Sequence, residues 1–333
     1  MTAYVVRRVF YMIITLALVS VVGFAIIQLP PGDFLTTHLR QLGLTGTQLS
    51  EEELQDIRAY YGLDKPGYMQ YFVWVGNMLR GDLGESYSYR IPVGELLGDR
   101  LPLTVLVSLL TIMLTFLLAV PIGIYSATHQ YSLGDYTATV FGFVGLATPN
   151  FMLALLLMWI SLSWFGFPIT GLFSSEYLDK PWSVAKFLDM LLHLPVAIVV
   201  VATGGSAGLI RVMRGSLLDE LQKQYVITAR SKGLDEGSLL FKYPVRIAMN
   251  PIISGIGGVF PEIVSGTIIT AIVLNLPTVG PLLFNALTQE DMQLAASIVM
   301  VLSVLTVVGV FVSDMLLLWL DPRIRFGAGR STA

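Results

Sequence analysis

The sequence of 333 residues contains no cysteine. It can therefore form no disulfide framework, no thiolate metal site and no cysteine nucleophile. Charged residues are also scarce, at 13% of the chain, whereas hydrophobic residues make up 54% and the mean hydropathy is +0.72. This composition excludes an ordinary soluble globular protein. No basic tail and no interleaving of basic and aromatic residues is present, which argues against a nucleic-acid-binding surface.

Motifs for catalysis and nucleotide binding are missing as well. Because the chain has no G-x-x-x-x-G-K-[ST] sequence, ATP and Mg²⁺ would have to be bound by other subunits. No serine lies in a G-x-S-x-G elbow, so an intramembrane hydrolase has little support. The three histidines, His38, His129 and His193, fall in separate predicted loops and form no metal-binding pair. We expect a protein that is not an enzyme and carries no cofactor or metal.

Long apolar runs are abundant. Six of them are long enough to cross a hydrocarbon core of about 30 Å as helices. These runs lie at about 5–29, 103–125, 136–165, 194–210, 252–274 and 294–320. The first run could be a secretory signal, but it is too long and ends at Pro30-Pro31 instead of a small-residue cleavage site. The sequence predicts an all-α polytopic membrane protein with six transmembrane helices.

The apolar runs also suggest how the chain is divided. The expected parts are an N-terminal transmembrane helix at 1–30, an extracytoplasmic segment at 31–100, a five-helix core at 101–325 and a tail at 326–333. Within the outer segment, Ser50 is a candidate N-cap for a helix that ends near Gly62.

Charge predicts the orientation of the chain. Residues 31–100 hold six basic against ten acidic residues, whereas the loop at 211–250 holds seven basic against four acidic residues. The loop at 275–293 contains Glu290 and Asp291 and no basic residue. Since basic loops stay in the cytoplasm, both termini and the 211–250 loop are expected there.

The charged stretch 216–251 is predicted to contact a soluble partner. Leu217, Leu221, Tyr225 and Thr228 recur at helical spacing, which predicts one helix as far as Lys232. Gly233 should then end that helix in a left-handed conformation, and Asp235 should cap a second helix. The alternative is a basic amphipathic helix that lies on the inner leaflet, although that would need no glycine turn.

A few polar residues and prolines interrupt the apolar runs. Glu262 lies near the middle of the fifth run and Asp314 near the end of the sixth, where a carboxylate must be paired, hydrated or protonated. Glu262 is equally consistent with the translocation route and with a structural hydrogen bond, whereas Asp314 is better explained as structural. Pro149 and Asn150, within the third run, could shape a pathway or merely kink a packed helix.

The loop carries the pattern Y-V-x-T-A-R-x-K-G-L from Tyr225 to Leu234. This pattern resembles the cytoplasmic EAA loop with which permeases of ABC importers dock onto their ATPase subunits. The docking residues that the resemblance implies are Leu221, Gln224, Tyr225, Thr228, Ala229, Arg230, Lys232, Gly233 and Leu234.

The resemblance extends over nearly the whole chain, to the dipeptide and oligopeptide permeases that have a long outer segment after the first helix. It is carried outside the loop by Pro31-Gly32-Asp33, Gly62-Leu63-Asp64-Lys65-Pro66, Gln70-Tyr71, Trp74, Arg80-Gly81-Asp82-Leu83-Gly84-Glu85-Ser86, Pro92-Val93, Arg100-Leu101-Pro102-Leu103-Thr104 and Asp321-Pro322-Arg323-Ile324-Arg325. It implies a type I ABC importer permease fold in a bacterial or archaeal inner membrane. The implied partners are a sister permease, two ATPase subunits and an extracytoplasmic solute-binding protein.

The substrate is less well defined by the sequence. Where many members of this family have E-x-x-F-x-x-P-G-x-G, this chain has AIVLNLPTVG at 271–280. Peptides are the first expectation, and oligosaccharides, opines or nickel are alternatives within the same family. An ion-coupled secondary transporter is a further alternative, but it is usually built from inverted repeats and none is visible here.

Overall fold

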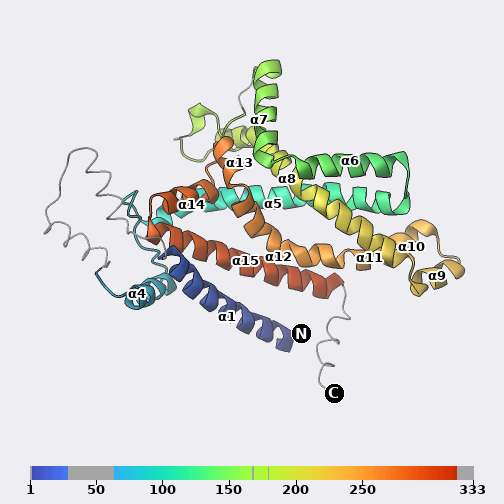
Figure 1. Cartoon of the computed structure of the whole chain (residues 1–333), viewed down its shortest axis with the longest axis horizontal. Helices are drawn as coiled ribbons and strands as arrows, with labels where there is room; N and C mark the ends of the chain where they lie inside the picture. Colours follow the sequence, from blue (N-terminus) through green and yellow to red (C-terminus); the bar gives the residue numbers. More distant parts are fainter. Residues whose placement is uncertain (1, 29–63, 167–168, 179, 321–333) are drawn as a thin grey trace. The chain divides into compact units, whose positions relative to one another are not determined.

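The computed structural model describes residues 2–28, 64–166, 169–178 and 180–320 (Figure 1). In this part of the chain the regular elements are helices, apart from one isolated β-bridge between Glu85 and Pro92. The helix predicted from Ser50 to Gly62 lies outside the described residues. The chain forms two compact units: unit 1 comprises Met1–Arg8, Thr104–Pro277 and Thr306–Ala333, and unit 2 comprises Val9–Leu103 and Thr278–Leu305.

Four helices in the described part of the chain are each long and apolar enough to cross a membrane. They are α1 (Thr2–Ile27), α5 (Val93–Thr128), α8 (Val184–Leu221) and α15 (Met292–Leu320). The predicted all-α membrane fold is thus confirmed, but α5 and α8 each begin about ten residues earlier than their apolar runs suggested. In α8 the early start places Pro195 inside the helix.

The third predicted span is a bent pair of helices instead of one helix. α6 (Leu133–Ala147) and α7 (Asn150–Ile160) meet at 100°, and a π-helical turn, η1 (Ser161–Phe165), follows α7. Thr148 is extended, with ψ at 117°. A residue before proline avoids the helical region, and Pro149 itself has no N–H for a helical hydrogen bond. The pair counts as a fifth span if both helices are taken together.

The fifth predicted span is also divided. α12 (Asn250–Gly266) and α13 (Ile268–Val273) meet at Thr267, where the helical geometry is interrupted. The number of unbroken spanning helices in the described residues is therefore four, whereas the sequence predicted six.

A hydrophobic core of unit 1 lies around the C-terminal part of α8. Met213 and Leu217 are fully buried against α5, α12 and the short helix α11 (Pro244–Ala248). An ion pair links α1 to α15 in this unit, since Arg8 Nη2 lies 2.5 Å from Asp314 Oδ1. The Asp314 side chain is 11% exposed, and its pairing agrees with the structural role expected for it.

Unit 2 is organised around α4 (Gly67–Leu79), α14 (Val279–Thr288) and the first half of α15. Trp74, Val93, Leu282 and Ile298 form the centre of its core. Phe24 of α1 packs on Trp74, with ring centroids 5.6 Å apart.

The Arg80–Ser86 motif forms a turn that is anchored to the start of α15. Gly84 has φ of +76°, which favours glycine, and a β-carbon there would lie 2.2 Å from the side-chain nitrogen of Gln293, so a larger residue would displace that side chain. Gln293 Nε2 donates to Leu83 O at 2.8 Å, and Ser86 Oγ donates to Asp291 Oδ2 at 2.6 Å. The motif thus has a structural role, which is to fasten this turn to the core of unit 2.

Candidate functional site

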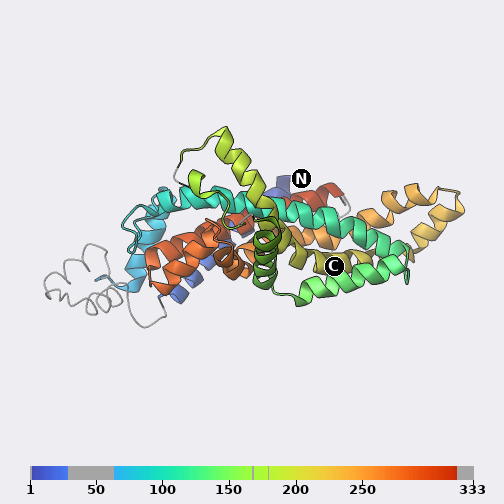
Figure 2. The ribbon, with the colours of Figure 1, turned by 90° about the horizontal axis from the view of Figure 1, so that it is seen from above.

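The charged loop forms a hairpin of two short helices. α9 (Gln224–Ser231) and α10 (Glu236–Lys242) follow α8, and they extend beyond its end in both views (Figures 1 and 2). The prediction of one helix from Leu217 to Lys232 is wrong, because α8 ends at Leu221 and Lys223 is extended. Burial of Val226 and Ala229 against Leu239 compensates for the helical hydrogen bonds lost at this break.

Gly233 ends α9 as predicted. Its φ is +77°, its N–H donates to Arg230 O at 3.0 Å, and the N–H of Leu234 donates to Ala229 O at 3.4 Å. These two bonds are those of a Schellman C-cap. Asp235 then caps α10 by accepting a hydrogen bond from the backbone N–H of Ser238 at 3.1 Å. The predicted turn chemistry is confirmed at both residues.

The hairpin has a small core of its own. Val226 and Leu239 are fully buried and Ala229 is 8% exposed, and Tyr225, Leu234 and Tyr243 pack around them. Ala229, assigned to the docking surface from the sequence pattern, therefore faces inward. Leu221 is the last residue of α8 and packs with Met213 and Leu217 of a different cluster.

Side-chain hydrogen bonds to two carboxylates link the residues on either side of the Gly233 turn and of the break before α9. Arg230 Nε and Nη2 donate to the two carboxylate oxygens of Glu236 at 2.5 and 3.0 Å, across the Gly233 turn. The hydrogen bond from Arg230 lowers the pKa of the exposed Glu236 carboxyl. Across the break before α9, Tyr225 Oη donates to Glu220 Oε2 at 2.5 Å. Burial, and then this hydrogen bond, raises the pKa of Tyr225, so its hydroxyl stays protonated as a donor.

The outer surface of the hairpin is mixed in character. Five of the predicted docking residues are exposed, namely Gln224, Thr228, Arg230, Lys232 and Gly233. Two exposed apolar residues were missed by the sequence reasoning: Ile227 is 47% exposed and Phe241 is 63% exposed. Both lie outside the apolar stripe from which the helix was predicted. Large apolar residues in an otherwise polar loop could have indicated a contact surface.

The three candidate pathway residues lie on two different helices. Pro149 is the N-cap of α7, and Asn150 follows it. A β-carbon on Gly204 of α8 would lie only 2.7 Å from Asn150 Oδ1, so Asn150 packs directly on that helix. Glu262 lies on α12, is exposed, and makes no hydrogen bond or ion pair with the part of the chain that is described.

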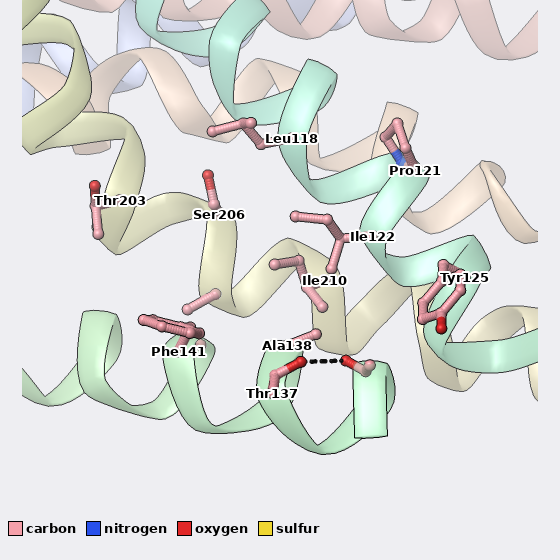
Figure 3. A pocket seen from close by; sticks show the side chains of 13 residues that line it. Leu118, Pro121, Ile122, Tyr125, Thr137, Ala138, Phe141, Thr203, Ser206 and Ile210 are labelled. Carbon is pink, nitrogen blue, oxygen red and sulfur yellow. Dashed lines mark hydrogen bonds between the residues drawn. The ribbon is translucent and has the colours of Figure 1, made fainter. Parts of the chain in front are cut away.

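A groove of about 580 Å³ lies within unit 1, between α5, α6 and α8 (Figure 3). Its walls are mostly apolar, with Leu118 and Ile122 facing Phe141 and Ile210. The hydroxyls of Thr203 and Ser206 donate to carbonyls of their own helix, at 2.7 and 2.6 Å, as does Thr137. Since these donor hydrogens are already used, these three hydroxyls can offer a polar substrate only acceptor oxygens.

The long apolar helices define a polytopic membrane protein, and the glycine-capped hairpin forms an exposed element at one end of α8. Comparison with protein families agrees. Residues 119–326 match the binding-protein-dependent transport system inner membrane component family, and residues 1–110 match the N-terminal family of such membrane components. The chain belongs to this family of inner-membrane permeases of ABC importers. Such permeases work with ATPase and binding-protein partners.

Similar proteins match over nearly the full length. The chain is 34% identical to the oligopeptide transport system permease protein AppB of Bacillus subtilis, with 98% of this chain and all of that protein covered. It is 29% identical to the inner membrane ABC transporter permease protein YejB of Escherichia coli O157:H7, covering 98% and 99%. It is also 29% identical to the dipeptide transport system permease protein DppB of Alkalihalophilus pseudofirmus, covering 98% and 100%.

Proposed function

We propose that this chain is one of two permease subunits of an importer that takes up di- or oligopeptides by alternating access. A solute-binding protein delivers the substrate, and two ATPase subunits bind ATP and Mg²⁺. The main support for an ATP-driven importer is the exposed hairpin of α9 and α10. It is a folded structure that an ATPase subunit could contact, and it is joined directly to the long helix α8. The absence of a phosphate-binding loop in the sequence supports ATP binding on other chains.

Peptides are proposed as the substrate because of the similar proteins. Two of them are named as oligopeptide and dipeptide transport permeases. Residues 271–280 differ from the pattern common in this family, but the similarity to peptide permeases over the full length is the stronger indication of the substrate. Oligosaccharides, opines and nickel have no comparable support, and a secondary transporter would not need the docking hairpin.

Copurification and binding assays test this function together. The chain should be expressed with its sister permease and with ATPase subunits encoded nearby, then isolated in mild detergent. Stoichiometric ATPase is the expected result, and its absence would favour a secondary transporter. A solute-binding protein encoded next to this chain should melt at a higher temperature with peptides but not with oligosaccharides, because a ligand that binds only the folded state stabilises it. The reverse pattern would overturn the peptide assignment.

Cysteine labelling tests the proposed orientation, with both termini and the hairpin in the cytoplasm. Lys180→Cys and Lys223→Cys place single thiols at exposed positions in a chain that has no other cysteine. In intact spheroplasts, an impermeant maleimide should label only Lys180→Cys, and both variants should react after lysis. Labelling of Lys223→Cys before lysis would contradict the orientation.

Glu262 is proposed to line the translocation route or its gate, since it is exposed on an apolar helix without a partner in the described residues. Glu262→Gln keeps the shape and hydrogen-bonding capacity of the side chain while removing its charge. We expect normal assembly and a several-fold change in peptide uptake by proteoliposomes. A loss of folded protein, with uptake per folded complex unchanged, would instead indicate a structural role.

A further inference from the structure

A buried ion pair joins α6 to α8 within unit 1. Arg214 Nε and Nη2 donate to the two carboxylate oxygens of Asp135 at 3.0 and 2.9 Å. The Asp135 side chain is only 4% exposed, and its Oδ2 also accepts a hydrogen bond from Tyr131 N at 3.0 Å. Because the planar guanidinium matches the carboxylate at two points, this pair fixes the orientation of one helix against the other.

The same antiparallel register continues along both helices. Seven residues after Asp135 on α6 is Gly142, and seven residues before Arg214 on α8 is Ala207. A β-carbon on Gly142 would lie 3.9 Å from the β-carbon of Ala207, and one on Gly145 would lie 3.2 Å from Cγ2 of Thr203. The two helices are thus in close contact from the ion pair to the last turn of α6.

This helix pair connects the hairpin to the α6–α7 bend. α8 continues from Arg214 to Leu221 without interruption, and the hairpin follows. At the other end, α6 stops at the bend, where Asn150 packs against Gly204 of α8. A displacement of the hairpin that moves α8 would therefore carry α6 and the bend with it as long as α6 stays fastened to α8.

We propose that Asp135 is a positioning residue for coupling. Its ion pair with Arg214 fastens α6 to α8, so that both helices move as one rigid body when the ATPase subunits move the hairpin. This inference rests on the proposed function of the hairpin as the ATPase contact. It assigns to Asp135 a role in transport efficiency, separate from ATPase binding.

Asp135→Asn tests the role of the ion pair. The reconstituted complex should retain its ATPase subunits and basal ATP hydrolysis, while peptide uptake per ATP falls by about fivefold or more, as expected when coupling between two sites is weakened. Arg211→Gln is the matched comparison, because it removes a charge from the same helix but leaves the Asp135–Arg214 pair in place. Its cation–π contact with Phe143 of α6 is a weaker link between the two helices, so a smaller effect on uptake per ATP is expected. Normal uptake per ATP in assembled Asp135→Asn would overturn the inference while leaving the proposed function intact. Failure of the parent complex to bind ATPase would instead overturn the proposed function.

A cross-link tests the rigid-body movement directly. The spacing of 3.9 Å between the β-carbons at Gly142 and Ala207 is in the range of a disulfide, about 3.5–4.5 Å. Oxidised Gly142→Cys/Ala207→Cys should transport peptide as fast as the reduced form. A loss of transport on oxidation that is reversed by reductant would show that the two helices must separate, and would overturn the inference.

The two changes can also be combined. If Asp135 acts by fastening the helices, oxidation of the variant Asp135→Asn/Gly142→Cys/Ala207→Cys should restore uptake per ATP toward the parent value. A general loss of stability would not be corrected in this specific way. Failure of the disulfide to restore coupling, once its formation is verified by mobility on gels, would contradict the proposed fastening role.

Discussion

Gly233→Val is expected to abolish substrate-stimulated ATP hydrolysis while the membrane helices remain inserted and folded. Gly233 has φ of +77°, and no atom lies within 4 Å of a β-carbon built there, so the cost of valine comes from the backbone conformation alone. That cost is about 1–2 kcal/mol, which lowers the ratio of native to non-native turn about 5- to 30-fold. α10 would then leave α9 in a different direction. Hydrolysis and uptake should be measured together in proteoliposomes.

Two matched controls separate the turn from the local charge. Gly233→Asn should retain most of the coupling, because asparagine adopts the left-handed conformation more readily than other residues with a β-carbon. Lys232→Ala removes the adjacent charge without changing the turn and should also have a small effect. Wild-type transport by Gly233→Val would show that this turn is not the coupling element.

Asp291→Ala should produce the largest loss of stability in unit 2. The Asp291 side chain is fully buried and accepts hydrogen bonds from Ser86 Oγ, from Ser88 N and from Leu294 N. Alanine removes an N-terminal cap, which costs about 1 kcal/mol. It also leaves buried donors without partners, at about 1–3 kcal/mol for such a group. We expect a thermal midpoint in detergent that is lower by several degrees, and faster tryptic cleavage at Arg90.

Asp291→Asn is the control for this change. Its single amide oxygen can accept either the capping hydrogen bond from Leu294 N or the two hydrogen bonds from Ser86 Oγ and Ser88 N. Its midpoint should therefore lie between those of the parent protein and Asp291→Ala. If Asp291→Ala were as stable as the parent protein, the anchoring of the Arg80–Ser86 turn described above would be incorrect.

The two helix ends at the Gly233 turn could be predicted from the sequence. Gly233 and Asp235 were assigned correctly because helix caps depend on a few neighbouring residues. The proline before α7 indicated a bend, but not a bend of 100°, because its size depends on how α7 packs beyond the break. The break after Leu221 contains no glycine or proline, and the apolar spacing continues across it without interruption.

Long-range contacts were beyond prediction from one sequence. Ser86 and Asp291 are 205 residues apart, and Asp135 and Arg214 are 79 apart, and no local pattern links either pair. Burial within the hairpin could not be predicted from the sequence either. The pattern around Tyr225 located the hairpin, but it did not distinguish Ala229, which is buried inside it, from Ile227, which faces outward. Burial depends on the partner helix α10, and so on the fold of the turn between them.

The length of α8 sets how far the hairpin stands from the bilayer. At 1.5 Å per residue its 38 residues span about 57 Å if straight, well beyond a hydrocarbon thickness of about 30 Å. The apolar part ends at Ile210, and the segment from Arg211 to Leu221 extends about 16 Å further. This segment acts as a stalk that carries the hairpin past the lipid headgroups. In the complex proposed above, the ATPase would then reach the hairpin through water, without displacing lipid from the membrane surface.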